Sequence, residues 1–191
     1  MNERPPLDPR IVANEIIDIA RDFEFEVTHL SLQKIVYFLH EAYLLETGQP
    51  LCMGFFEAWK HGPVHPQLWS SFKASGRGPI RHHAYGLDIK TGAAKNLPKI
   101  SSAELRRYIT AAALKWLPIP APSLVGLSHA RNSPWDHLTK RSGGQREYGE
   151  RITNELIVSC RTGTGRVLPI RDTSLDEDDL YEQPPSRNRT G

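Results

Sequence analysis

The chain has 191 residues, 39% of them hydrophobic and 15 of them proline, a length that usually forms one domain. Its 24 basic and 22 acidic side chains leave a formal net charge of +2, which gives little support for nucleic acid as a partner. Two isolated cysteines, no apolar run of about 20 residues and no hydrophobic segment in residues 1–10 argue against disulfides, a membrane span and a secretion signal, so we expect a soluble, cytoplasmic protein.

Signals for two helices open the chain. Asp8 is suited to cap a first helix that has Pro9 at its first position. Apolar residues then recur three and four positions apart, as one buried stripe requires: Val12, Ile16, Ile19 and Phe23. Thr28 is the next candidate cap, and Gly48 predicts that the second helix ends near Glu46.

The second predicted helix is apolar on nearly all sides. Its main apolar face and the residues that extend it are Leu32, Ile35, Val36, Leu39, Tyr43, Tyr37, Phe38, Leu44 and Leu45. Lys34 and Glu41, with Gln33 and His40 beside them, form a narrow polar strip. A helix with so little polar surface packs at the centre of a fold, so we predict that the other elements surround it.

A sharp bend is predicted after a short aromatic segment. Residues 51–59 could form a strand, and Gly62 and Pro63 follow it closely. Glycine can adopt a positive φ, while proline fixes its own φ at about −65° and lacks an N–H donor. The bend therefore holds one shape close to Trp59, and no nucleophile lies beside it. This combination favours a recognition scaffold over a catalyst.

A short helix and a turn-rich segment follow the bend. His65 and Pro66 predict the start of the helix, which carries Trp69 and has Gly76 as its stop signal. Residues 81–99 are interrupted by glycine and proline and have little apolar periodicity. We predict a small hairpin or a loop there.

Signals for further helices lie in the second half of the chain. Ser101–Glu104 has the pattern of a capping box and predicts a helix that lasts until Pro118. The apolar positions of this helix are Leu105, Ile109, Ala112 and Trp116. Ser123 and Ser133–Pro134 predict two more helix starts. A last helix that ends near Cys160 is predicted from a spacing of four between Tyr148, Ile152 and Leu156.

The C-terminal residues differ in composition from the rest. Residues 172–191 hold six acidic and two basic side chains, which leaves +6 for the preceding part. The little apolar surface there could not offset the entropy lost on ordering, so we predict a disordered, acidic and proline-rich tail over residues 161–191. Residues 1–160 are predicted to form one compact, mainly α domain, with an α+β arrangement left open by the strand and hairpin signals.

No pattern in the sequence predicts catalysis or metal binding. His61 and His65 are separated by the Gly-Pro bend, which prevents them from forming a His-x-x-x-His pair on a helix. Structural zinc sites usually contain clustered cysteines, and no nucleophile signature such as G-x-S-x-G is present. We predict hydrogen-bonded or surface histidines, no metal, no cofactor and no catalytic residue.

Three of the four tryptophans are candidates for partner anchors. Trp116 falls on an apolar stripe and is predicted to lie in the core. Trp59, Trp69 and Trp135 lie next to turns and prolines, where a large aromatic ring either fills the fold or anchors a partner. We favour the filling role for each of the three.

Three blocks of sequence carry a resemblance: residues 32–38 are LQKIVYF, residues 57–64 are EAWKHGPV, and residues 127–135 contain LSH and SPW. In the same order they resemble the L-Q-K-L-x-Y-F, E-A-W-x-x-G-P-V and L-S-H…P-W signatures of the SocA-like antitoxin family, also called the Panacea domain. The resemblance extends over about residues 8–160. The candidate motif or partner-binding residues are Gln33, Lys34, Tyr37, Glu57, Trp59, His61, Gly62, Pro63, Val64, Trp69, Pro134 and Trp135.

The resemblance implies a largely helical antitoxin that neutralises a cognate protein toxin by direct contact. The branch that gives the family its name is also linked to delivery of the toxin to a AAA+ protease, and this role as a proteolytic adaptor is left open for this chain. Two alternatives remain open from the residues themselves. One is a nucleic-acid-binding regulator that uses the +6 part of the chain. The other is a metal-dependent hydrolase built from His61, His65 and distant acids.

Overall fold

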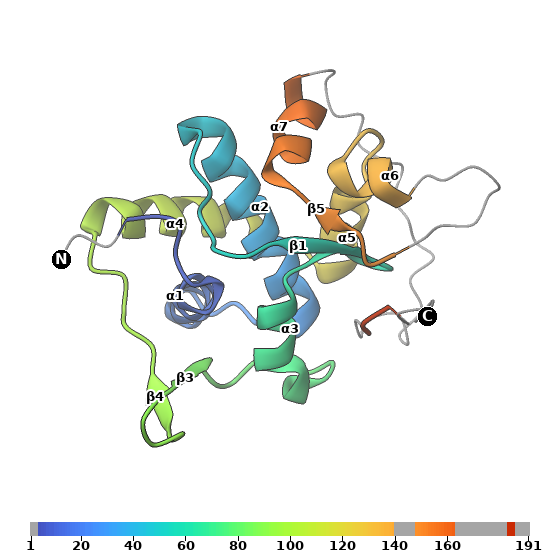
Figure 1. Cartoon of the computed structure of the whole chain (residues 1–191). Coiled ribbons are helices and arrows are strands. Elements are labelled where there is room, and N and C mark those ends of the chain that lie inside the picture. Colours follow the sequence, from blue (N-terminus) through green and yellow to red (C-terminus); the bar gives the residue numbers. More distant parts are fainter. Residues whose placement is uncertain (1–3, 140–147, 163–182, 186–191) are drawn as a thin grey trace.

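The computed structural model of the chain describes residues 4–139, 148–162 and 183–185. Within these ranges the fold is mainly helical with a few short strands, as predicted (Figure 1). In chain order the elements are α1 (Pro9–Asp22), α2 (His29–Thr47), β1 (Phe56–Trp59), β2 (Gly62–Val64), α3 (Pro66–Phe72), the 3₁₀ turn η1 (Lys73–Ser75), β3 (Tyr85–Leu87), β4 (Ala94–Asn96), α4 (Ala103–Trp116), α5 (Ala121–Ser128), α6 (Pro134–Thr139), β5 (Arg151–Ile152) and α7 (Asn154–Thr162).

Helix α2 lies at the centre of the molecule, which confirms the prediction of a central helix. Figure 1 shows α1 and α4 on one side of it and α5 on the other, and α2 contacts all three as well as α3 and α7. Every side chain from His29 to Glu41 is buried. The predicted polar strip is therefore buried too, and its groups must find partners inside the fold.

Short-range signals determine where the first two helices begin and end. Asp8 caps α1 by accepting a hydrogen bond from Arg10 N at 2.9 Å, with Pro9 next along the chain. Thr28 caps α2 in a capping box with Ser31, and Gly48 ends α2 in the left-handed conformation at φ 72°. These boundaries agree with the sequence prediction because each depends on neighbouring residues alone.

Two later helix starts differ from the prediction. Ser102 caps α4 by accepting from Leu105 N at 3.2 Å, which puts Glu104 at the second helical position, not the third that a capping box needs. Helix α5 begins at Ala121, so the predicted start at Ser123 lies inside it. The predicted start of α6 at Pro134 is confirmed.

The predicted last helix is wrong at its N-terminal end. Ile152 belongs to β5, which pairs antiparallel with β1 through Phe56 and Ile152, and α7 begins only at Asn154. Tyr148 precedes both elements. The spacing of four was misleading because Ile152 is buried by a strand about a hundred residues away, a contact that local periodicity cannot reveal.

Two small sheets complete the fold. Strand β1 lies between β2 and β5, all antiparallel, which confirms a strand in residues 51–59. Strands β3 and β4 form a separate antiparallel hairpin that projects from the body in Figure 1, so residues 81–99 contain a hairpin. Trp116, predicted to lie in the core, is half-buried: it stacks on Phe38 at a centroid distance of 4.5 Å and packs against the core from outside.

The predicted boundary between domain and tail falls near the end of α7, which reaches Thr162. Apart from that end and residues 183–185, the predicted tail lies outside the described residues. None of the helices in the described part of the chain has the length and apolarity that a bilayer crossing requires.

Candidate functional site

The three sequence blocks meet at one corner of the fold, formed by β1, β2 and the turn between them and called here the Gly-Pro corner (residues 56–64). Gly62 pairs with Trp59 across the turn and has a φ of 102°. A Cβ built on Gly62 would overlap Ser128 Oγ and lie 3.1 Å from Lys34 Cε. Both the backbone angle and the lack of space therefore require glycine.

Polar side chains from α2 hold the strand that leaves the corner. Lys34 is fully buried, and its Nζ donates to the carbonyl oxygen of Pro63 at 3.1 Å. Gln33, equally buried, accepts the backbone N–H of His65 through Oε1 at 2.9 Å. Since β2 is short and at the edge of its sheet, these bonds satisfy backbone groups that the sheet leaves over. The polar strip of α2 is thus the support of the corner.

Aromatic residues hold the other strand of the corner. The indole Nε1 of Trp59 donates to Glu57 Oε2 at 2.7 Å. The indole Nε1 of Trp135, on α6, donates to the carbonyl oxygen of Trp59 at 2.6 Å. The ring of His129 stacks on Trp135 with 3.5 Å between centroids and 11° between planes. These contacts join the second block to the third.

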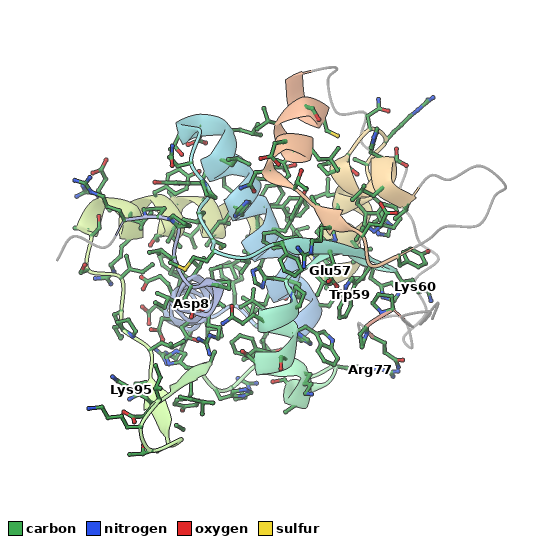
Figure 2. The ribbon with its side chains drawn as sticks, in the orientation of Figure 1. Asp8, Glu57, Trp59, Lys60, Arg77 and Lys95 are labelled. Atoms are coloured by element: carbon green, nitrogen blue, oxygen red, sulfur yellow. The ribbon has the colours of Figure 1, made fainter. Side chains whose placement is uncertain are left out.

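The remaining candidate residues surround this arrangement. Tyr37 meets Phe56 edge to face at 5.2 Å on the α2 side of β1. Val64 and Pro134 are buried, in β2 and at the first position of α6. His61 is buried in the turn. Figure 2 shows Glu57 and Trp59 on β1, inside the molecule.

Burial decides what these residues can do. Trp59 is 3% and Trp135 is 1% exposed, and of the candidate residues only Trp69 is partly exposed. Side chains this buried act on a partner through the shape that they impose on the chain. Trp59 and Trp135 therefore fill the interior of the fold, which is the role favoured for them from the sequence. Direct contact of any candidate residue with a partner stays a prediction.

Two histidines beside the corner are held in neutral forms. His40 Nδ1 accepts the backbone N–H of Cys52 at 3.2 Å, so the proton lies on Nε2, which donates to Asn154 Oδ1 at 3.0 Å. His65 Nε2 donates to the carbonyl oxygen of Met53 at 2.9 Å. Burial lowers the pKa of both rings below the usual range because charging them would require desolvating a cation. Both rings therefore act as structural hydrogen-bonding groups.

The described residues contain no group of three histidine, cysteine or acidic side chains placed to share a metal ion. His65, one of the two histidines of the hydrolase alternative, uses its Nε2 in the bond to Met53. In the described residues, the site consists of hydrogen bonds and stacked rings that fix the path of the backbone.

The exposed surface next to the corner is basic. Trp69 lies against Trp59 with 5.8 Å between ring centroids, and Lys73 Nζ lies 5.1 Å from the Trp69 ring. Lys60 and Arg77 are exposed, and Figure 2 shows both at the edge of the molecule on the side of β1 that ends in the turn. Lys60, Lys73 and Arg77 were not among the residues predicted from the sequence. Their position as basic residues next to turns is the feature of the sequence that indicates them.

Comparisons with known proteins relate the chain to one family. The family model described as Antitoxin SocA-like, Panacea domain, matches residues 32–136, a range that includes most of α2, the Gly-Pro corner and Trp135. The curated protein Antitoxin SocA of Caulobacter vibrioides (strain NA1000 / CB15N) is 36% identical over 151 residues, which cover 79% of this chain and 80% of that protein. No solved structure gives a significant match.

Proposed function

Because the chain belongs to the SocA-like antitoxin family with its Panacea domain, we propose that it is the antitoxin of a toxin-antitoxin pair and neutralises its cognate toxin by direct protein-protein binding. The similarity to the antitoxin of Caulobacter vibrioides, which extends over most of both chains, is the observation that carries this proposal. We also propose that the pair acts in the cytoplasm and that this chain has no catalytic activity of its own.

The geometry of the corner supports a binding role. Neutralisation at nanomolar affinity corresponds to about −12 kcal/mol, and part of the binding energy is lost whenever a surface must be ordered during association. Buried bonds from Lys34, Gln33 and Trp135 fix the strands of the corner before any partner arrives. Such a pre-organised body loses little entropy on binding.

Co-expression with the neighbouring gene tests the proposal. The product of the adjacent open reading frame is expected to stop growth alone, to be tolerated when this chain is present, and to co-purify with it at a fixed ratio. Rescue without complex formation would argue for a catalytic or regulatory mechanism. Failure to rescue would reject the antitoxin function.

Delivery of the toxin to a AAA+ protease, which the family resemblance implies, stays a prediction. Delivery requires that this chain shortens the half-life of the toxin in the presence of the protease and ATP, whereas sequestration alone lengthens it or leaves it unchanged. A nucleic-acid regulator would instead bind operator DNA with an affinity that falls steeply with salt. The same purified protein serves for both measurements.

A further inference from the structure

The β3–β4 hairpin exposes apolar side chains to an unusual degree. Ile89 is 100%, Leu87 is 73% and Tyr85 is 51% exposed. Tyr85 and Leu87 lie two residues apart on β3, so both point to the same face of the hairpin. In the register of the strands they are opposite Asn96 and Ala94, which are exposed as well. An uncovered apolar face on a soluble chain is a typical feature of an interaction site.

The tip of the hairpin is held rigidly despite its exposure. Asp88 Oδ1 accepts from Lys90 N and Thr91 N, both at 2.9 Å, and from Thr91 Oγ1 at 3.1 Å. The backbone closes the same turn, because Asp88 N donates to Ala93 O and Gly92 N donates to Asp88 O, both at 2.8 Å. Ile89 is therefore presented by an ordered loop, which reduces the entropy lost when it is buried by a partner.

The base of the hairpin is fixed to α1. Asn14 forms a pair of hydrogen bonds with the backbone of Ala84, at 3.0 Å to the carbonyl and 2.8 Å from the amide. Arg10 Nη1 donates to Tyr85 O at 3.0 Å. Asp18 accepts from His83 Nε2 at 2.9 Å. The hairpin thus projects in a direction that the body of the protein determines.

The charge around the apolar face is positive. Lys90 and Lys95 are exposed, and Figure 2 shows Lys95 at the outer side of the hairpin. Lys99, also exposed, lies 3.5 Å from Asp18 of α1. Asp88 is the acidic residue between positions 85 and 99, and its carboxylate is occupied by the backbone of the turn. A complementary surface therefore needs an apolar pocket with acidic groups around it.

A hollow of about 580 Å³ continues this surface at the base of the hairpin. Tyr85 is the β3 residue that lines it. The rest of the lining mixes apolar side chains such as Phe25 and Ile80 with charged ones such as Glu24 and Arg81. Because Tyr85 also lies on the apolar face of the hairpin, a partner seated on that face would adjoin this hollow.

We propose that the β3–β4 hairpin is the toxin-docking element, with Leu87 and Ile89 entering an apolar pocket of the toxin and Lys90 and Lys95 facing acidic groups at the rim of that pocket. This inference rests on the proposed antitoxin function. A protein partner fits better than nucleic acid because the tip carries aliphatic side chains, which do not stack on bases as aromatic rings do.

The test compares two changes of the same kind at opposite ends of the molecule. Leu87→Ser together with Ile89→Ser removes the apolar tip, while Leu45→Ser removes a 38% exposed leucine near the end of α2, far from the hairpin in Figure 1. The probe is the toxin that co-purifies with the wild-type chain, with affinity measured by calorimetry and folding by thermal unfolding.

The double variant is expected to bind the toxin about 30-fold or more weakly, to lose rescue in cells and to unfold at the wild-type temperature. Leu45→Ser should bind within about threefold of wild type. Lys90→Glu with Lys95→Glu should slow association about tenfold and reduce its dependence on salt.

Undiminished binding by the Leu87→Ser and Ile89→Ser variant would overturn the docking role while the antitoxin function stands. If the wild-type chain itself binds no neighbouring gene product, both proposals fail together. Self-association of the toxin-free chain, or its binding to nucleic acid or to anionic phospholipid vesicles, through Leu87 and Ile89 would assign the hairpin to another occupant and would also overturn the docking role.

Discussion

The Gly-Pro corner and the β3–β4 hairpin are both short antiparallel turns, but their side chains have opposite surroundings. In the corner, groups from α2 and α6 bond the strand backbone, and Trp59 is 3% exposed. In the hairpin, α1 bonds the base, and Ile89 at the tip is 100% exposed. The residues of the family signatures therefore hold the shape of the fold, whereas the most exposed apolar surface of the described residues lies between the signature blocks.

The largest loss of stability is expected from a substitution in the Gly-Pro corner. Gly62→Ala forces a side chain into a positive φ and onto Ser128, and we expect the free energy of unfolding to fall by about 3 kcal/mol in urea denaturation. Gly48→Ala is the matched control, since Gly48 also has a positive φ but has nothing within 4 Å of its Cβ position. It should lose about 1 kcal/mol. Equal losses at the two positions would contradict the packing argument.

A milder change removes one hydrogen bond of the corner. Trp135→Phe deletes the indole that donates to the buried carbonyl of Trp59, and the lost hydrogen bond together with the smaller buried ring should reduce the free energy of unfolding by about 2 kcal/mol. Trp116→Phe, which trims a half-buried ring stacked on Phe38, should cost about 1 kcal/mol or less. If Trp135→Phe is as harmless as its control, the bond to Trp59 does not stabilise the corner.

Acid should destabilise the fold through the two buried histidines beside the Gly-Pro corner. Burial lowers the pKa of His40 and His65 in the folded chain, so the unfolded chain binds protons first as the pH falls below about 6.5. Stability is therefore fully present above that pH and decreases below it, by on the order of 1 kcal/mol between about pH 7 and about pH 5. Urea titrations across this range measure the slope.

His40→Gln should flatten part of this pH dependence, because glutamine carries no titrating group. His82→Gln is the control, since the His82 ring is exposed. A slope that is unchanged in His40→Gln would show that other groups cause the loss in acid.

The smallest effect on stability is expected at the hairpin tip. Asp88→Ala removes the acceptor that orders the turn, and the free energy of unfolding should change by less than about 0.5 kcal/mol. Toxin binding should nevertheless weaken several-fold, because the tip must then be ordered during association. Asp88→Asn retains an oxygen acceptor and should bind like the wild type. Amide hydrogen exchange at Lys90 and Thr91 reports the loss of order directly.

The sequence predicts the parts of the fold that depend on neighbouring residues. The caps at Asp8 and Thr28, the stop at Gly48 and the nearly all-apolar second helix are local features, and each agrees with the structure. The predicted helix through Ile152 fails because β5 pairs with β1, about a hundred residues earlier in the chain. Residue propensity and local periodicity do not reflect such a long-range contact.

The site was less predictable for the same reason. From the sequence, Gln33 and Lys34 are only part of a polar strip on a helix. Their hydrogen bonds to the backbone of Pro63 and His65 depend on the folded chain. Tyr85, Leu87 and Ile89 alternate with other residues in a glycine-rich segment, a pattern too short to distinguish a buried strand from an exposed one. Their exposure follows from the direction that α1 gives to the hairpin.

The attachment of the hairpin through its base has a consequence for how such a protein can change. Asn14 and Asp18 hold the backbone and side chain of Ala84 and His83, whereas the tip beyond them bonds mainly to itself. The residues of the hairpin beyond these contacts can therefore be replaced without repacking the interior of the protein. One stable body could be retargeted to a different partner by replacing a dozen or so surface residues.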